Sequence, residues 1–119
     1  MVGIDIVKID RFDSINNLES FLNKYFALTE IDYIKQKKYS THTIAGLYAC
    51  KEAVLKAFGV GIGSGLSLNE VEITHDKLGA PQIVLTENMK VYLQKFDKKT
   101  ISVSISHDGE YAISVCQIL

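Results

Sequence analysis

The sequence predicts an α+β fold in one domain, residues 1–119, with an antiparallel sheet packed against a long central helix. Short runs that alternate apolar and polar residues stand near both ends of the chain, as in strands of a half-buried sheet. Residues 41–58 instead repeat apolar positions at helical spacing. The last two strand-like runs are joined by Asp108-Gly109, a tight hairpin turn that makes neighbouring strands antiparallel.

The first strand is expected at residues 2–9, VGIDIVKI, because β-branched residues dominate this run. Successive side chains of a strand point to opposite faces, so Asp5 lies on the face opposite Ile4 and Ile6. A lone carboxylate in an apolar strand is costly to bury unless it is paired or coordinated. Asp5 therefore either lies at a wet edge of the sheet or has a specific partner.

The other predicted elements are bounded by polar or turn residues. Helical spacing in residues 13–37 indicates two helices with a break near residues 27–29, where Thr29 could cap the second helix. After the central helix, the sequence favours strands at residues 66–76 and 80–86 joined by the turn KLGAP, a helix at residues 87–99, and strands at residues 100–108 and 110–119.

The central helix carries a stripe of small residues that is interrupted by one acid and one base. Ser40 or Thr41 can cap its first turn, and Gly59 suits the left-handed position just past its end. The stripe, at spacings of three or four, consists of Ala45, Ala49, Glu52, Lys56 and Gly59. Glu52 and Lys56 are then either an ordinary surface pair or polar groups at the bottom of a close contact with a ligand.

Composition excludes several classes of protein. The 13 Lys and Arg against 14 Asp and Glu give a net charge of −1, without the basic stripe of a nucleic-acid binder. Charges at Asp5, Lys8 and Arg11 exclude a signal-peptide core, and no apolar run approaches the ~20 residues that span a bilayer. Cys50 and Cys116 lack metal-site spacing and are interpreted as buried, reduced thiols. We expect a cytoplasmic protein without nucleic-acid or membrane partners.

Three features could bind a ligand. Asp5 and Glu52 would suit Mg²⁺ if they converge, because this ion is commonly held by one or two carboxylates plus substrate phosphates. The glycine run GVGIGSG at residues 59–65 lacks the lysine of a P-loop, so it is either a cap with a connection or a place where a ligand approaches bare backbone. His107 is either a surface residue beside a turn or, with Lys56, a phosphate contact.

Four segments in order, GIDIVKIDRF, AGLYACKEAVLKAFGVGIGSGLSLNEVEI, LGAPQI and ISVSISHDGEYAISVCQI, span essentially the whole chain. Together they resemble the holo-[acyl-carrier-protein] synthase family, the short single-domain 4'-phosphopantetheinyl transferases. The resemblance implies the 4'-phosphopantetheinyl transferase fold. It also implies transfer of 4'-phosphopantetheine from coenzyme A to a serine of apo acyl carrier protein, releasing adenosine 3',5'-bisphosphate, in support of fatty acid biosynthesis.

The resemblance also implies roles for individual residues. Asp5 and Glu52 match the family's Mg²⁺ ligands, and Lys56 matches a coenzyme A contact that is a candidate acid for the leaving group. The base that accepts the serine proton would be Glu52 or a water on the metal. The residues implied to contact coenzyme A are Lys56, Gly59, Pro81 and His107.

Short members of this family form trimers with active sites between adjacent subunits, which implies a homotrimer here. Their acidic carrier protein docks on basic residues of the first helical region, which places that contact at Arg11 and Lys24. The chain departs from the family in carrying Leu47 where an arginine is usual.

Two alternatives stay open at the level of sequence. A transferase of this kind could serve carrier domains of polyketide or peptide synthetases. The same residues could also be structural parts of a non-catalytic oligomeric nucleotide-binding module. A two-carboxylate nuclease is disfavoured because the basic stripe expected for nucleic acid is missing.

Overall fold

The computed structural model describes residues 1–59 and 66–119 and has an α+β architecture, as predicted. Its elements, in chain order, are β1 (Val2–Lys8), the 3-10 turn η1 (Ile9–Phe12), α1 (Leu18–Tyr25), α2 (Leu28–Gln36), α3 (Thr41–Ala57), the 3-10 turn η2 (Leu68–Glu70), β2 (Glu72–His75), β3 (Pro81–Val84), α4 (Glu87–Lys95), β4 (Ile101–Asp108) and β5 (Tyr111–Ile118).

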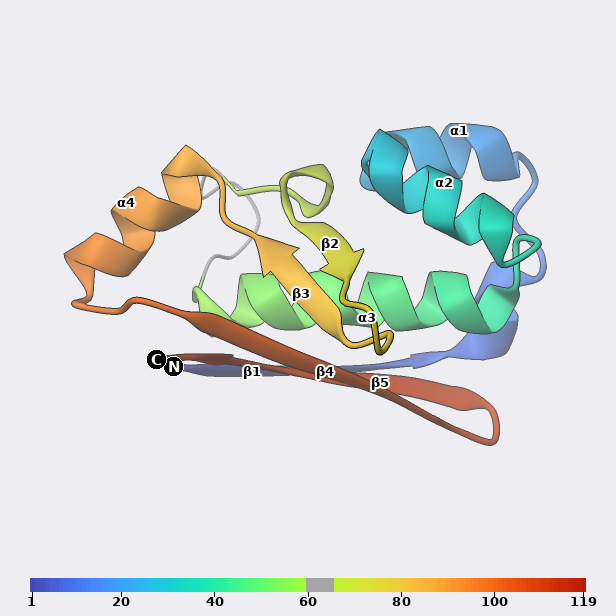
Figure 1. Ribbon diagram of the computed structural model, residues 1–119. Coiled ribbons are helices and arrows are strands. Elements are labelled where there is room, and N and C mark those ends of the chain that lie inside the picture. Colours follow the sequence, from blue (N-terminus) through green and yellow to red (C-terminus); the bar gives the residue numbers. More distant parts are fainter. Residues whose placement is uncertain (60–65) are drawn as a thin grey trace.

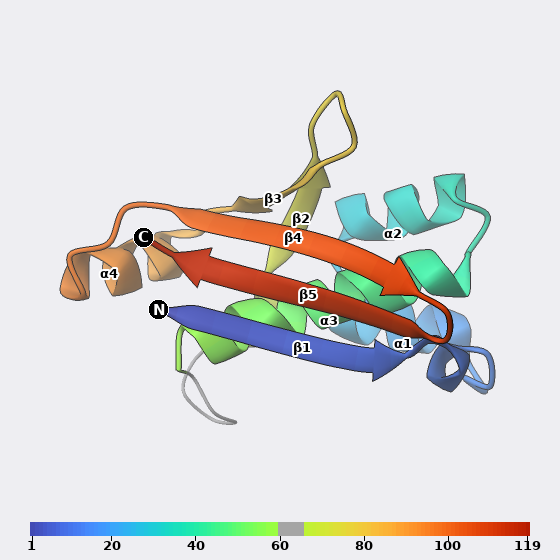
Figure 2. The ribbon, with the colours of Figure 1, turned by 90° about the horizontal axis from the view of Figure 1, so that it is seen from below.

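The strands form an antiparallel three-stranded sheet in the order β1-β5-β4 and a separate two-stranded sheet, β2-β3. Helix α3 lies along one face of the larger sheet, with α1 and α2 near one end of the molecule and α4 near the other (Figure 1). Viewed from below, the three strands lie side by side with no helix in front of them (Figure 2). The larger sheet is therefore covered on one face only.

Most observed ends of helices and strands follow from local sequence patterns, and tertiary contacts changed some of them. Gly59 has φ +68, the left-handed conformation predicted just past the central helix. The cap predicted at Thr29 is wrong: Ala27 is the N-cap residue of α2, and its backbone N–H donates to the carboxylate of Glu30. Ser40 stands at the N-cap position of α3 but makes no side-chain cap hydrogen bond.

The strand predicted at residues 66–76 is also wrong in its first half, where the chain forms η2 and only then enters β2. The carbonyl oxygens of Leu68 and Val71 turn inward and accept hydrogen bonds from Lys51 Nζ on α3. These two hydrogen bonds hold the segment before β2 against α3, where Leu68–Glu70 is a 3-10 turn, and β2 begins only at Glu72.

Close packing of β1 on α3 depends on Gly3. A Cβ atom at this position would lie 2.0 Å from the carbonyl oxygen of Ala53 and 2.5 Å from the backbone nitrogen of Ala57. Only a residue without a side chain allows the two backbones to approach this closely. The sheet edge that carries Asp5 is thus held directly against the C-terminal half of α3.

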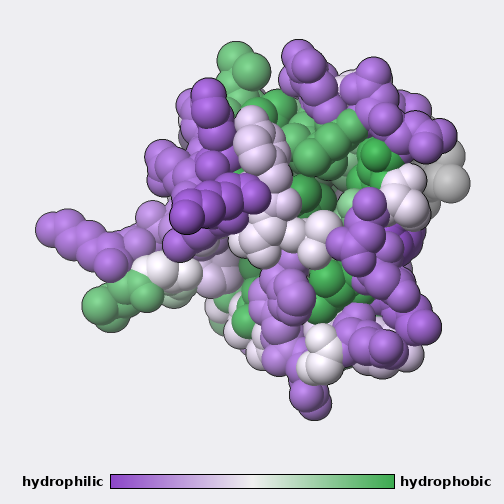
Figure 3. All heavy atoms as spheres, turned by 90° about the vertical axis from the view of Figure 1, so that its right-hand side faces the viewer, coloured by the Kyte–Doolittle hydropathy of each residue, from purple (hydrophilic) through white to green (hydrophobic). Residues whose placement is uncertain are grey.

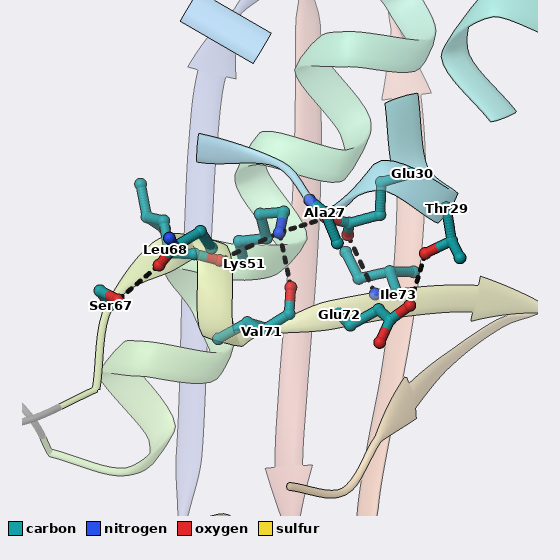
Figure 4. Close-up of polar contacts among 10 residues, drawn as sticks. Ala27, Thr29, Glu30, Lys51, Ser67, Leu68, Val71, Glu72 and Ile73 are labelled. Atoms are coloured by element: carbon teal, nitrogen blue, oxygen red, sulfur yellow. Dashed lines mark hydrogen bonds and ion pairs between the residues drawn. The ribbon is translucent and has the colours of Figure 1, made fainter. Parts of the chain in front are cut away.

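A buried ion pair joins α2, α3 and the entry to β2 (Figure 4). Lys51 Nζ lies 2.6 Å from Glu30 Oε1, and both side chains are fully buried. Glu30 Oε2 also accepts a hydrogen bond from the backbone N–H of Ile73 at 2.9 Å. Burial raises the pKa of Glu30 and lowers that of Lys51, and each charge opposes the shift of the other.

We predict that Lys51→Met lowers the free energy of unfolding by about 3–5 kcal/mol, because removing one partner leaves the Glu30 charge buried and uncompensated. Two backbone carbonyls also lose their donor. Urea unfolding followed by far-ultraviolet circular dichroism measures the change.

The matched control is Lys90→Met, because Lys90 also pairs with a glutamate, Glu87 on α4, but with side chains 52% and 88% exposed. An exposed pair of this kind contributes about 0–1 kcal/mol. Equal losses for the two variants would show that the Lys51 pair does not stabilise the fold.

Candidate active site

Asp5 lies on the face of β1 that packs against α3. Its neighbours Ile4 and Ile6 point the other way and are 56% and 59% exposed, whereas the Asp5 side chain is only 13% exposed. The alternation predicted for this strand is confirmed, and Asp5 is on the covered face rather than at a wet edge. A carboxylate in this position requires a partner.

Lys56, on the last turn of α3, is that partner. Its Nζ donates to Asp5 Oδ1 at 2.9 Å and to the backbone carbonyl of Ile4 at 3.2 Å. The hydrogen bond to Asp5 raises the pKa of Lys56, and the negative charges of Asp5 and Glu52 act in the same direction. Lys56 therefore forms its ion pair with Asp5 and not with Glu52, whose negative charge acts on it from a greater distance.

The second oxygen of Asp5 suits a metal ion. Asp5 Oδ2 is buried and has no hydrogen-bond partner among residues 1–59 and 66–119, although a buried carboxylate oxygen normally has one. Glu52, half-buried on α3, offers a second carboxylate near the same lysine. Among residues 1–59 and 66–119, no group of three or more His, Cys, Asp or Glu side chains could hold a metal. Any Mg²⁺ here would need ligand oxygens besides Asp5 and Glu52.

Sequence reasoning missed Tyr48, which borders this site. Its hydroxyl accepts a hydrogen bond from Arg11 Nη2 at 3.4 Å, and the guanidinium carbon lies 5.2 Å from the centre of its ring. Burial raises the pKa of Tyr48, with a further contribution from the nearby charge of Glu52. Tyr48 precedes Glu52 by four residues, so the i,i+4 rule for helix faces could have identified it.

Pro81 and His107 line a different cavity, of about 210 Å³, together with Gly46 and Leu47 of α3. His107 Nε2 donates to the backbone carbonyl of His42 at 2.8 Å. A Cβ atom on Gly46 would lie 2.9 Å from His107 Nε2, so this glycine is what allows the imidazole to approach the helix. Asp5, Glu52 and Lys56 do not line this cavity.

The two groups of predicted residues lie on opposite sides of β5. Asp5 on β1 and Ile105 on β4 both pair with Ser114 of β5, and His107 is two residues beyond Ile105. Two strand spacings of about 4.8 Å separate β1 from β4. The structure thus brings Asp5, Glu52 and Lys56 together but does not bring His107 to them within one chain.

The remaining predicted residues lie around these two groups. Gly59 ends α3 three residues after Lys56, and the rest of the predicted glycine run, residues 60–65, lies outside the described residues. Lys24 is exposed on α1, with its Nζ 5.2 Å from the centre of the Tyr25 ring, and is not part of the Asp5 group.

Both cysteines are free and buried, as predicted. Burial raises the pKa of Cys50 to about 11 and that of Cys116 to about 12, so neither is a reactive thiolate. No helix in the described part of the chain is both long and apolar enough to span a bilayer.

Comparisons with known proteins identify the family of the chain. Residues 1–116 match the sequence model of the 4'-phosphopantetheinyl transferase superfamily. The chain is 39% identical over 114 residues to a holo-[acyl-carrier-protein] synthase of Caldicellulosiruptor bescii, covering 96% of this chain and 93% of the relative. It is 42% identical over 116 residues to the synthase of Campylobacter fetus, covering 96% and 95%.

Solved structures show the same likeness in three dimensions. The Helicobacter pylori holo-[acyl-carrier-protein] synthase in complex with coenzyme A superposes with a TM-score of 0.84 at 36% identity, covering 100% of both chains. The Bacillus anthracis synthase, in complex with coenzyme A (3',5'-ADP), has a TM-score of 0.79 at 28% identity, covering 98% of this chain and 93% of that one. The chain belongs to the 4'-phosphopantetheinyl transferase superfamily and, within it, to the holo-[acyl-carrier-protein] synthase family.

Proposed function

We propose that this protein transfers 4'-phosphopantetheine from coenzyme A to a serine of an apo acyl carrier protein, in a Mg²⁺-dependent reaction that releases adenosine 3',5'-bisphosphate. The observation that carries the proposal is the buried, unpartnered Oδ2 of Asp5 beside Lys56 and Glu52. Relatives across the whole chain are holo-[acyl-carrier-protein] synthases, and two solved ones hold coenzyme A.

Asp5 and Glu52 are the residues that would hold Mg²⁺, with ligand phosphate oxygens as further donors. When bound, the ion would offset negative charge on the pyrophosphate of coenzyme A. Hard oxygen donors match this cation, and the free oxygen of Asp5 is already excluded from water.

Lys56 would stabilise charge on the departing phosphate. The hydrogen bond to Asp5 raises its pKa, which makes it a stable cation and a weaker proton donor. Phosphoryl transfer depends mainly on positioning and electrostatic stabilisation, so a fixed ammonium beside the pyrophosphate fits the reaction. We therefore assign Lys56 an electrostatic role in preference to that of a general acid.

The chemical step exchanges one P–O bond for another. The serine oxygen attacks the phosphorus that carries the pantetheine arm, and the bond from that phosphorus to the bisphosphate leaving group breaks. The serine proton goes to a base, and the electron pair of the broken bond stays on the leaving phosphate. Glu52 is the carboxylate placed to accept that proton, since Asp5 is already engaged by Lys56.

His107, Pro81 and Gly59 are proposed to contact coenzyme A. His107 and Pro81 border the same cavity. Because His107 Nε2 donates to the His42 carbonyl, Nδ1 could donate to a phosphate oxygen only in the imidazolium form, in which both ring nitrogens carry a proton. Leu47, almost fully buried, lines this cavity as well and adds no charge to it. Recognition of phosphate on this side would therefore depend more on His107 than it would with an arginine at position 47.

The acyl carrier protein is proposed to dock on the end of the molecule formed by η1, α1 and α2. Figure 3 shows this end, where hydrophobic surface lies between hydrophilic side chains. Arg11 and Lys24 supply exposed positive charge there. Arg11 also reaches Tyr48 beside the Asp5 group, so a carrier bound to it would place its serine near the proposed metal site.

We further propose a homotrimer with active sites between subunits. The uncovered face of the sheet exposes apolar side chains on adjacent strands, namely Val2, Ile4, Ile6, Tyr111 and Val115. Contiguous exposed apolar surface marks an interaction site. Head-to-tail packing of copies would bury this face and could bring His107 of one subunit toward Asp5 of the next, joining groups that lie apart within one chain.

The proposal treats residues 1–119 as one 4'-phosphopantetheinyl transferase domain, supported by a family match over residues 1–116. A cytoplasmic location is part of it, supported by two buried free thiols, Cys50 and Cys116. We also infer that the modified carrier serves fatty acid biosynthesis, on the strength of the family alone.

We predict that apo acyl carrier protein incubated with this protein, coenzyme A and Mg²⁺ gains one phosphopantetheinyl group, detected by intact-mass spectrometry. EDTA should prevent the gain. Glu52→Ala should lower turnover at least ~100-fold, because it removes a metal ligand and the proposed base while the helix retains its core contacts.

Glu87→Ala is the matched control, because Glu87 is an exposed glutamate on α4 far from the site in sequence. It should be as active as wild type. Undiminished turnover by Glu52→Ala would remove Glu52 from the mechanism. No modification by wild type, with any of several carriers, would contradict the transferase proposal and favour the nucleotide-binding module.

We predict that two inactive variants, Glu52→Ala and His107→Ala, complement each other when refolded as a mixture. In a ring of shared sites, each site would take Glu52 from one subunit and His107 from its neighbour. When the two variants mix at random, about a quarter of the sites would contain both residues intact. Light scattering coupled to gel filtration should show a trimer.

Ile4→Asp tests the same interface by placing a charge on the apolar face. It should yield a folded monomer without transferase activity, because the shared sites would be lost. An active wild-type monomer, or a mixture of the two variants with no recovered activity, would overturn the shared-site proposal.

A further inference from the structure

Arg11 is held against α3 by Tyr48. The guanidinium donates to the Tyr48 hydroxyl at 3.4 Å and lies over two aromatic rings, with its carbon 5.2 Å from the centre of Tyr48 and 5.7 Å from that of Phe12. A guanidinium over an aromatic face is attracted by the ring's negative charge density. The arginine is exposed, yet its orientation is defined by a residue of the central helix.

Tyr48 and Glu52 lie on the same side of α3, one turn apart. Residues four apart on a helix lie on one face, and Tyr48 and Glu52 have this spacing within Thr41–Ala57. Because the Tyr48 oxygen accepts from Arg11, its own proton is free to be donated to the Glu52 carboxylate. The nearby charge of Glu52 contributes to the raised pKa of this tyrosine, after burial.

The Tyr48 ring cannot swing freely. It packs against three other aromatic rings, edge-on to Phe12 at 5.3 Å and to Tyr25 at 6.4 Å, and stacked on Phe21 at 6.4 Å between ring centres. These neighbours come from η1 and α1 and bury the ring's body. The packed ring therefore holds the hydroxyl in place beside Arg11, on the side of α3 that carries Glu52.

We propose that Tyr48 is a positioning residue of the transferase, whose hydroxyl orients the Glu52 carboxylate toward the site shared with Asp5 and at the same time holds Arg11 ready for the carrier protein. The inference rests on the proposed function. Groups that orient a metal-ligating carboxylate affect metal affinity as strongly as activity. Tyr48 would thus connect carrier docking to the group that accepts the serine proton.

Tyr48→Phe is the test, because it deletes the hydroxyl and keeps the ring that packs in the aromatic cluster. We expect Mn²⁺, used as a spectroscopic substitute for Mg²⁺, to bind about 10-fold more weakly by electron paramagnetic resonance titration in the presence of coenzyme A. We also expect kcat/KM for the carrier protein to fall about 10-fold, with the thermal unfolding midpoint unchanged within a few degrees.

Tyr25→Phe is the matched control for metal binding, since Tyr25 belongs to the same aromatic cluster and is packed edge-on to Tyr48. It should bind Mn²⁺ like wild type. The variants Arg11→Ala, Tyr48→Phe and the double variant complete a cycle, in which the loss of kcat/KM in the double variant should be smaller than the product of the two single losses, because the two side chains share one role.

Wild-type affinity for Mn²⁺ in Tyr48→Phe would overturn the inference, as would losses of kcat/KM that simply multiply in the double variant. These outcomes are distinct from failure of the proposed function. If wild type modified no carrier, the transferase proposal would fail, while the Mn²⁺ titration of Tyr48→Phe against Tyr25→Phe would still decide whether the hydroxyl orients Glu52.

Discussion

The buried pair of Lys51 and Glu30 is the interaction on which the arrangement of helices and strands depends. It joins α2 to α3 and anchors the entry to β2, three elements that are distant in sequence (Figure 4). Taking both charges out of water is costly, and their attraction offsets this cost only when further hydrogen bonds are satisfied. Four backbone groups supply those bonds here.

Lys51 and Glu52, neighbours in the KEA motif, point in different directions because a helix turns about 100° per residue. Lys51 points into the protein toward α2 and the entry to β2, where it is fully buried. Glu52 points toward the side of Tyr48 and Lys56, where it is half-buried and open to a ligand. Because Lys51 is anchored in the core, the orientation of Glu52 beside it is fixed as well. This would help a reaction that depends on the positions of its groups.

Helix α3 divides the functional residues into two groups because it lies along the middle of the sheet. Gly3 lets β1 approach one side of the helix and Gly46 lets His107 approach the other. Asp5 and Lys56 meet on the first side, whereas His107 borders the cavity on the second. A single chain therefore holds these residues in two separate groups, which the proposed trimer would bring together.

Local patterns in the sequence determined the helix of residues 41–57, the closing hairpin and the left-handed Gly59, because these depend on contacts within a few residues. They also placed Glu52 and Lys56 on one helix face. In the strand predicted from residue 66, Leu68–Glu70 instead form a 3-10 turn, and Lys51, far away in sequence, donates to the carbonyls of Leu68 and Val71 there. Only the tertiary structure decided that Asp5 meets Lys56 while His107 stays apart, since strand order and helix placement arise from long-range packing that no local periodicity encodes.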